Sequence, residues 1–142
     1  MAQRIVPMLA YEDGVAAIEF LTRAFGFTED ESQRYTNDDG TVGHAELELD
    51  GERIMLSTPN PDYQGPKRHR ENCDAARRWM DNPWVIDGVF VRVDDLDTHH
   101  DRAKAAGAKI IREPGEPGVG FRIYSVEDPE GHRWMFGEPS AN

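Results

Sequence analysis

The sequence predicts an α+β fold in which one βαβββ module occurs twice. Some segments alternate apolar and polar residues, as strands do, and others repeat apolar residues every three or four positions, as helices do. Segments of the two halves also resemble each other at an offset of roughly 80 residues, which indicates an internal duplication. The best match pairs DGERIML at 50–56 with EGHRWMF at 130–136.

The first half carries one complete set of these signals. The expected elements are a strand over 4–10, a helix over 13–26, a strand over 28–35 and a hairpin formed by 44–49 and 52–57. Asp13 is a suitable N-cap for the helix, and Gly26 stands where a helix-ending glycine is expected. Asp50-Gly51 is a strong signal for a two-residue hairpin turn.

The second half repeats the order of elements. A strand over 88–93, a helix that follows Asp94-Asp95 and ends at Gly107, a strand over 109–112 and a hairpin of 121–126 and 133–136 are expected. The chain is therefore predicted to be one domain, 1–142, with module one at about 1–58, a connector at about 59–87 and module two at about 88–138.

The connector breaks the pattern with prolines and charges. One short helix is expected over 72–80, and the basic run at 67–70 is expected to be solvated. Trp79 and Trp84 are candidates for core or dimer contacts, or for a lid over a binding site, because long connectors are often functional.

Composition narrows the classes of function. The 142 residues carry a formal net charge of −11, which disfavours nucleic-acid binding. No apolar run approaches the roughly 18 residues that a spanning helix needs, and no signal peptide is recognised at the start. The single cysteine, Cys73, is consistent with a reducing cytoplasm.

A strand that ends in a short acidic segment, a helix that ends near FGF or AAGA, and a final DPEGHRWMF together resemble the vicinal oxygen chelate superfamily. The similarity is greatest to its small bacterial glyoxalase/bleomycin-resistance-like members. The resemblance implies curved mixed sheets around a small-molecule cup, a helix on the outer face of each sheet, and a homodimer. It does not imply a particular reaction, because this fold hosts several chemistries.

The resemblance also locates the family's metal ligands on the first and last strands of each module. Those positions fall on Val6, Met55, Gly88 and Met135. Valine and glycine side chains donate no lone pair, and a thioether suits the divalent metals of these enzymes poorly. The sequence therefore predicts that this centre is lost, with no metal and no cofactor.

Alternation predicts which side chains face the cup. Pairing across Asp50-Gly51 places Glu46 opposite Met55 and Glu48 opposite Arg53, and pairing across the DPEG turn places Tyr124 opposite Met135. The expected ligand-binding residues are His44, Glu46, Arg53, Met55, Ser57, Phe90, Arg92, Arg122, Tyr124 and Met135.

Several alternatives remain open. His44 and Glu46 could hold a metal if Tyr124 or Ser57 added a third ligand, although an ion pair between Glu46 and Arg122 or Arg53 is the simpler interpretation. At least one of the two helix residues His99 and His100 is expected at the surface, and His132 is expected to stabilise the closing loop.

The leading hypothesis for function is a metal-free protein that binds a small molecule, either a drug or a metabolite. The alternative is a lyase, isomerase or dioxygenase, either with a metal on unpredicted residues or with Glu46 or His44 as a general base. An interaction protein that docks a partner on its basic connector is a third class.

Overall fold

The computed structural model describes residues 3–82 and 87–140. Trp84 lies outside these ranges. The chain divides into two compact units, 1–65 and 66–142, and each is described by itself. No helix among the described residues is long and apolar enough to cross a membrane.

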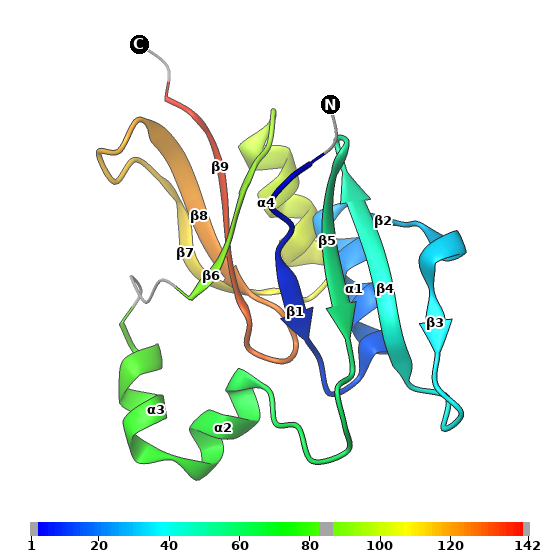
Figure 1. The fold of residues 1–142 in the computed structure, drawn as a ribbon. Helices are drawn as coiled ribbons and strands as arrows, with labels where there is room; N and C mark the ends of the chain where they lie inside the picture. The colour runs from blue at the N-terminus through cyan, green and yellow to red at the C-terminus, as the bar shows by residue number, and fades with distance from the viewer. Residues whose placement is uncertain (1–2, 83–86, 141–142) are drawn as a thin grey trace. The chain divides into compact units, whose positions relative to one another are not determined.

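The first unit contains a mixed sheet with one helix on one of its faces (Figure 1). Its elements are β1 (Met8–Ala10), α1 (Gly14–Phe25), β2 (Thr28–Glu29), the 3-10 turn η1 (Glu31–Gln33), β3 (Tyr35–Thr36), β4 (Val42–Leu49) and β5 (Glu52–Ser57). The strand order is β1-β5-β4-β2, with β3 also paired to β4. β1 runs parallel to β5, and the other pairs are antiparallel.

Helix α1 forms where the sequence predicts it. The Asp13 side chain accepts a hydrogen bond from the Ala16 backbone N–H at 3.0 Å, which satisfies one of the free donors of the first turn. The helix ends at Gly26, whose φ of 85° lies in the left-handed region that glycine adopts without strain. Leu21 and Phe25 on the apolar face are fully buried.

The hairpin of β4 and β5 has the predicted register. Asp50 and Gly51 both have positive φ, 51° and 84°, as a two-residue turn of the primed type requires. Glu46 therefore lies opposite Met55, and Glu48 lies opposite Arg53. The alternate residues are buried on the side of α1, and they are Ala45, Leu47, Ile54 and Leu56.

The strand predicted over 28–35 is wrong in its middle. It is divided into β2 and β3 by η1, because the Asp30 carboxylate accepts hydrogen bonds from the backbone N–H and the hydroxyl of Ser32. An aspartate that bonds the backbone two residues ahead favours a turn over an extended strand. At this break the Asp30 N–H donates to the Glu46 carbonyl at 2.9 Å, so Asp30 lies beside β4.

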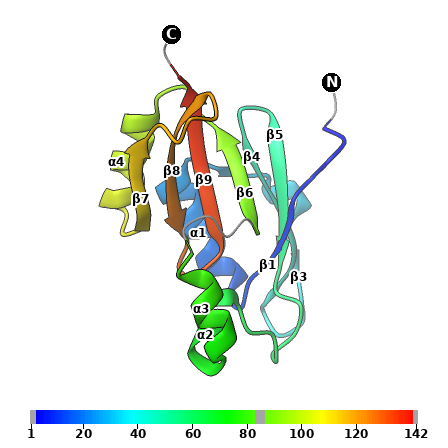
Figure 2. The same cartoon turned by 90° about the vertical axis from the view of Figure 1, so that its left-hand side faces the viewer.

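The second unit repeats the architecture with two additional helices. Its elements are α2 (Pro66–Asn72), α3 (Asp74–Met80), β6 (Gly88–Arg92), α4 (Leu96–Ala105), β7 (Lys109–Gly115), β8 (Phe121–Glu127) and β9 (Arg133–Pro139). The strands lie in the order β6-β9-β8-β7, side by side in Figure 2. Only β6 and β9 are parallel. The predicted α+β class with two βαβββ modules, each with a helix on one face, is confirmed.

The predicted pairing of the closing hairpin is wrong by one residue. The turn contains three residues between Asp128 and His132, closed by the Asp128 N–H on the His132 carbonyl at 3.0 Å, with Gly131 at a φ of 89°. Ser125 therefore lies opposite Met135, and Tyr124 lies opposite Phe136. A shift of one residue moves every side chain of β8 to the other face of the sheet.

The connector also differs from the prediction. Two helices replace the single one expected over 72–80, because Cys73 is extended between them, with φ −142° and ψ 113°. Arg70 is not simply solvated, since its guanidinium makes two hydrogen bonds of 3.0 and 2.8 Å with the Glu127 carboxylate. The Lys67 N–H also donates to the Glu130 carbonyl at 2.9 Å. These contacts attach α2 to the β8–β9 turn.

Candidate functional site

The sheet of the second unit has one face covered by α4 and an opposite face, here called the second open face. Paired residues share a face, so the register arranges this surface in rows that cross the sheet from β6 to β7. One row is Phe90, Met135, Ser125 and Arg112, and the next is Arg92, Gly137, Ile123 and Gly115.

Phe90 forms an aromatic platform on this face. A Cβ atom at Gly137 would come within 2.8 Å of its Cζ, so the ring lies directly over this glycine. The edge of the Phe121 ring supports it, with centroids 5.3 Å apart and planes at 78°. The side chain remains 47% exposed. An exposed apolar ring held from below and from the side is a suitable surface for an apolar ligand.

A small pocket of about 50 Å³ lies at the β7 edge of the same sheet. Its lining residues are Arg112, Glu113, Gly115, Glu116, Pro117, Ile123 and Ser125. The register of β7 against β8 shifts twice, between Ile110 and Arg112 and between Arg112 and Gly115. Such irregularities bend an edge strand and redirect its side chains, and they are frequent next to binding sites.

A buried ion pair network occupies the end of the second open face. Arg133 lies 3.5 Å from the Glu127 carboxylate, and its guanidinium donates to the carbonyls of Asn82 and Met80 at 2.8 and 2.9 Å. Burial alone would raise the pKa of Glu127, but the hydrogen bonds from Arg70 and the charges of Arg70, Lys109 and Arg133 outweigh it and lower the pKa. The network holds the end of α3 against the sheet.

The first unit has its own open face, opposite α1, and it is ionic. Glu46 accepts from Arg53 at 3.2 Å, and its other oxygen lies 2.9 Å from His44 Nε2. Arg53 also donates to Asp30 at 3.0 Å. Hydrogen bonds from Ser32 and then Arg53 lower the pKa of Asp30. Met8, opposite Met55 in β1, adds an apolar side chain that is 80% exposed.

The structure divides the ten predicted site residues into three groups, of which the third consists of Tyr124 and Arg122. His44, Glu46, Arg53, Met55 and Ser57 belong to β4 and β5 of the first unit, and Phe90, Arg92 and Met135 belong to the second open face. The predicted ion pair of Glu46 with Arg53 is confirmed, and Arg122 pairs within its own unit with Asp97 and Glu138.

Tyr124 and Arg122 lie on the face of α4, not on the second open face, and their predicted placement is wrong. Tyr124 is fully buried, and its hydroxyl lies 2.6 Å from His99 Nδ1. Arg122 pairs with Asp97 of α4 and with Glu138. The longer DPEGH turn is the physical reason, because it shifts β8 by one residue.

The expectation that His99 or His100 lies at the surface is also wrong. The His99 ring is half-buried, with its centroid 4.1 Å from that of Phe136. His100 is buried, and its Nε2 lies 2.6 Å from Glu113, close enough for an ion pair but outside the alignment of a hydrogen bond. Both histidines pack around Tyr124.

Sequence reasoning missed Asp30, Arg112 and Phe121. Asp30 follows a segment that reads as a continuous strand, and Arg112 stands where two irregularities interrupt the alternation of β7. The placement of Phe121 was predictable from the burial of its own strand. Tyr124 and Val126 extend the buried apolar face of Trp134 and Phe136 only in the observed register, and alternation along the strand then places Phe121 on the opposite face.

The residues at the four positions where the resemblance places metal ligands do not fit a metal. Val6, Met55, Gly88 and Met135 present no oxygen or nitrogen side-chain ligand. Across residues 3–82 and 87–140, no three His, Cys, Asp or Glu side chains are grouped so that they could hold a metal ion. The carboxylates of Glu46 and Asp30 contact Arg53.

Comparison with known families and proteins identifies relatives over nearly the whole chain. The family model described as Glyoxalase/Bleomycin resistance protein/Dioxygenase superfamily matches residues 4–136. An uncharacterized protein of Mycobacterium tuberculosis strain H37Rv is 30% identical over 137 residues, which are 94% of this chain and 72% of the relative. A similar uncharacterized protein of Mycobacterium bovis is also 30% identical.

Solved structures agree with these matches. TioX from Micromonospora sp. ML1 is 30% identical with a TM-score of 0.66, covering 99% of this chain and 98% of that one. A bleomycin-binding protein complexed with bleomycin is 16% identical, with a TM-score of 0.65, and covers 98% of this chain and 100% of its own. The fosfomycin resistance protein FosX of Listeria monocytogenes is 12% identical, with a TM-score of 0.65 and 99% and 95% coverage. The last two likenesses show the fold alone.

Proposed function

Because the chain belongs to the Glyoxalase/Bleomycin resistance protein/Dioxygenase superfamily, we propose that it is a binding protein for an apolar small molecule and that it works without a metal. The observation that carries this proposal is the platform of Phe90 on Gly137 and Phe121. A half-exposed aromatic ring that is held in place supplies apolar contact area at little cost in side-chain entropy.

The chemistry of the family positions supports the same proposal. Met55 and Met135 stand where a catalytic member places ligands. Thioether side chains adapt to apolar ligands of varied shape, and they are poor partners for hard divalent cations. The fold itself accommodates a drug, since a bleomycin-binding protein has it.

The ligand contacts that we propose are given for each unit by itself. They are His44, Glu46, Arg53, Met55 and Ser57 of the first unit, and Phe90, Arg92 and Met135 of the second. A homodimer in the cytoplasm belongs to the same proposal, and sedimentation equilibrium of the purified protein measures the oligomeric state.

The test of the apolar platform uses two variants that act on one ring. Phe90→Ala removes the ring, and Gly137→Ala adds a Cβ atom within 2.8 Å of the ring's Cζ and displaces it. Calorimetric titration with a panel of aromatic drugs, bleomycin included, should give a saturable ligand whose affinity falls about tenfold in both variants. Val15→Ala, at an exposed position of α1, is the matched control and should bind like the wild type.

The test of metal independence is elemental analysis together with a thermal titration with Ni²⁺, Zn²⁺, Mn²⁺ and Fe²⁺. A specific ligand at 100 times its Kd stabilises the folded state by about 2.7 kcal/mol. We expect no stoichiometric metal and no such shift. A stoichiometric metal that raises the Tm would overturn the metal-free part of the proposal.

A second candidate function is a metal-free enzyme, favoured by the contact of 2.9 Å between His44 and Glu46. A carboxylate that orients an imidazole is an arrangement used for general base catalysis. Mass spectrometry of each bound compound after incubation would reveal conversion. In that case His44→Asn should abolish the conversion even at ligand concentrations that saturate the variant.

A further inference from the structure

We propose that the ligand carries a carboxylate that docks on Arg112 and Ser125 at the bulged edge of β7 while its apolar body lies on Phe90. This inference rests on the proposed binding function and specifies the chemical class of its ligand.

The register of the second sheet places the residues that would contact the two ends of such a ligand in one row. Phe90 of β6 lies beside Met135 of β9, which lies beside Ser125 of β8, which lies beside Arg112 of β7. Neighbouring strands are about 4.8 Å apart, so the row spans about 14 Å from its first to its last strand. Its side chains change from aromatic through thioether to hydroxyl and guanidinium, which matches a molecule that is apolar at one end and anionic at the other.

The shape of the β7 edge provides a seat for a small polar group. Gly115 carries no side chain, and Ile123 and Pro117 provide apolar walls, so the hollow of about 50 Å³ remains open beside Arg112. This volume holds a group of the size of a carboxylate and not the body of a drug. The ligand's apolar part must therefore lie outside the pocket, along the row toward Phe90.

Ser125 contributes a hydroxyl group to the lining of this pocket. It is only 1% exposed and lines the hollow beside Arg112. A carboxylate oxygen in the pocket would accept its hydrogen bond and that of the Arg112 fork.

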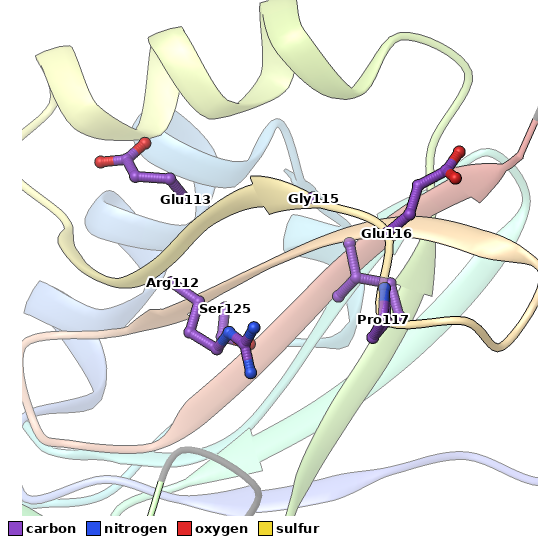
Figure 3. A pocket seen from close by; sticks show the side chains of 7 residues that line it. Arg112, Glu113, Gly115, Glu116, Pro117 and Ser125 are labelled. Atoms are coloured by element: carbon purple, nitrogen blue, oxygen red, sulfur yellow. The ribbon is translucent and has the colours of Figure 1, made fainter.

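The acidic lining residues do not oppose an anion next to Arg112. Figure 3 shows Glu113 on the opposite side of β7, toward α4, and Glu116 pointing away from the Arg112 guanidinium. Glu113 lies 2.6 Å from His100 and 3.9 Å from Lys104, so its charge is engaged on the far side of the sheet.

The charge of the second open face favours an anion, although the whole chain carries −11. Arg92 and Arg112 lie in adjacent rows of this face, and Arg92 forms no ion pair with any residue that the structure describes. Glu127 at the end of the face is already paired with Arg70 and Arg133. The local field therefore attracts a carboxylate that the rest of the surface repels.

The experiment compares two probes that differ only in charge, 6-(naphthalen-2-yl)hexanoate and its primary amide, by naphthalene fluorescence. In the wild type the acid should bind about tenfold more tightly than the amide, as a charge-assisted hydrogen bond to arginine allows. In Arg112→Ala the affinity for the acid should fall to that of the amide, whose own affinity stays within twofold. Ser125→Ala should remove part of the same preference.

Two controls distinguish a direct contact between Arg112 and the carboxylate from a general effect of charge or of apolar contact on binding. Arg102→Ala removes an equal charge from the exposed side of α4 and should leave the preference for the acid unchanged. Phe90→Ala should weaken both probes by the same factor, because the ring contacts the apolar body only. Thermal unfolding of each variant verifies that it is folded.

The possible failures are distinguishable. Equal affinity of the acid and the amide for the wild type would overturn the carboxylate site and leave the binding function standing. Equal weakening of both probes in Arg112→Ala would also overturn it, because the arginine would then act through packing. Absence of saturable binding of either probe would overturn the binding function and this inference together.

Discussion

The two units build the same module with different side chains. In the first unit, α1 is held by apolar burial, with Phe20, Leu21 and Phe25 against the sheet. In the second unit, α4 buries only Leu96, His100 and Ala103. Its attachment depends on polar contacts, above all the hydrogen bond between Tyr124 and His99 and the ion pairs of Arg122.

The difference teaches that a duplicated backbone does not require a duplicated core. Apolar burial is insensitive to pH and is lost in proportion to the volume removed. Buried polar contacts contribute little net free energy while intact, but they are costly when one partner is removed, and they respond to pH. The stability of the first unit should therefore depend most on the size of its buried apolar side chains. The stability of the second should depend most on buried polar side chains keeping their hydrogen-bond or ion-pair partners.

The largest loss of stability is expected from Leu21→Ala in α1. The side chain is fully buried, so its truncation leaves a cavity and should lower the free energy of unfolding by about 4 kcal/mol. Urea denaturation measures the change. A loss below about 1 kcal/mol would contradict the apolar account of the first unit.

The next effect is expected from Glu127→Gln in the second unit. The Glu127 and Arg133 side chains are 3% and 2% exposed, so the neutral amide leaves buried cations without their counterion. The free energy of unfolding at neutral pH should fall by about 3 kcal/mol. Glu116→Gln, at an exposed position of the same unit, is the control and should change it by less than about 0.5 kcal/mol.

The same carboxylate should make the stability of the wild type depend on acid pH. The pKa of Glu127 in the folded protein lies below its ordinary value of 4.5, so folding favours the ionised form. Its contribution is complete above pH 4.5 and disappears as the pH falls through the lowered pKa. The stability difference between the wild type and Glu127→Gln should therefore narrow in acid, and a constant difference from pH 7 to pH 3 would contradict the assignment.

A smaller loss of stability is expected from Tyr124→Phe. The variant keeps the ring in the core and removes the hydroxyl that lies 2.6 Å from His99, which should cost about 1 kcal/mol. Burial raises the pKa of Tyr124, so the hydroxyl stays protonated and available to His99 at any ordinary pH. Tyr35→Phe, at an exposed position of β3, should be neutral in the same measurement.

Much of the fold was predictable because its signals are local. Asp13 and Gly26 delimit α1 through contacts within a few residues of themselves, and Asp50-Gly51 determines the register of β4 and β5. The predicted pair of Glu46 and Arg53 follows from that register. The second hairpin failed at one point, the length of the DPEGH turn, and this error alone misplaced Tyr124 and Arg122.

The sequence by itself determined the α+β class, the duplicated βαβββ order and the absence of side-chain oxygen or nitrogen atoms at Val6, Met55, Gly88 and Met135. Local periodicity, turn chemistry and residue identity require no knowledge of distant contacts. Only the tertiary structure decided that Phe90 lies over Gly137, that Arg112 and Ser125 share a row, and that Arg70 reaches Glu127. These features depend on pairing between strands and helices far apart in the chain, and one residue of register changes which side chains meet.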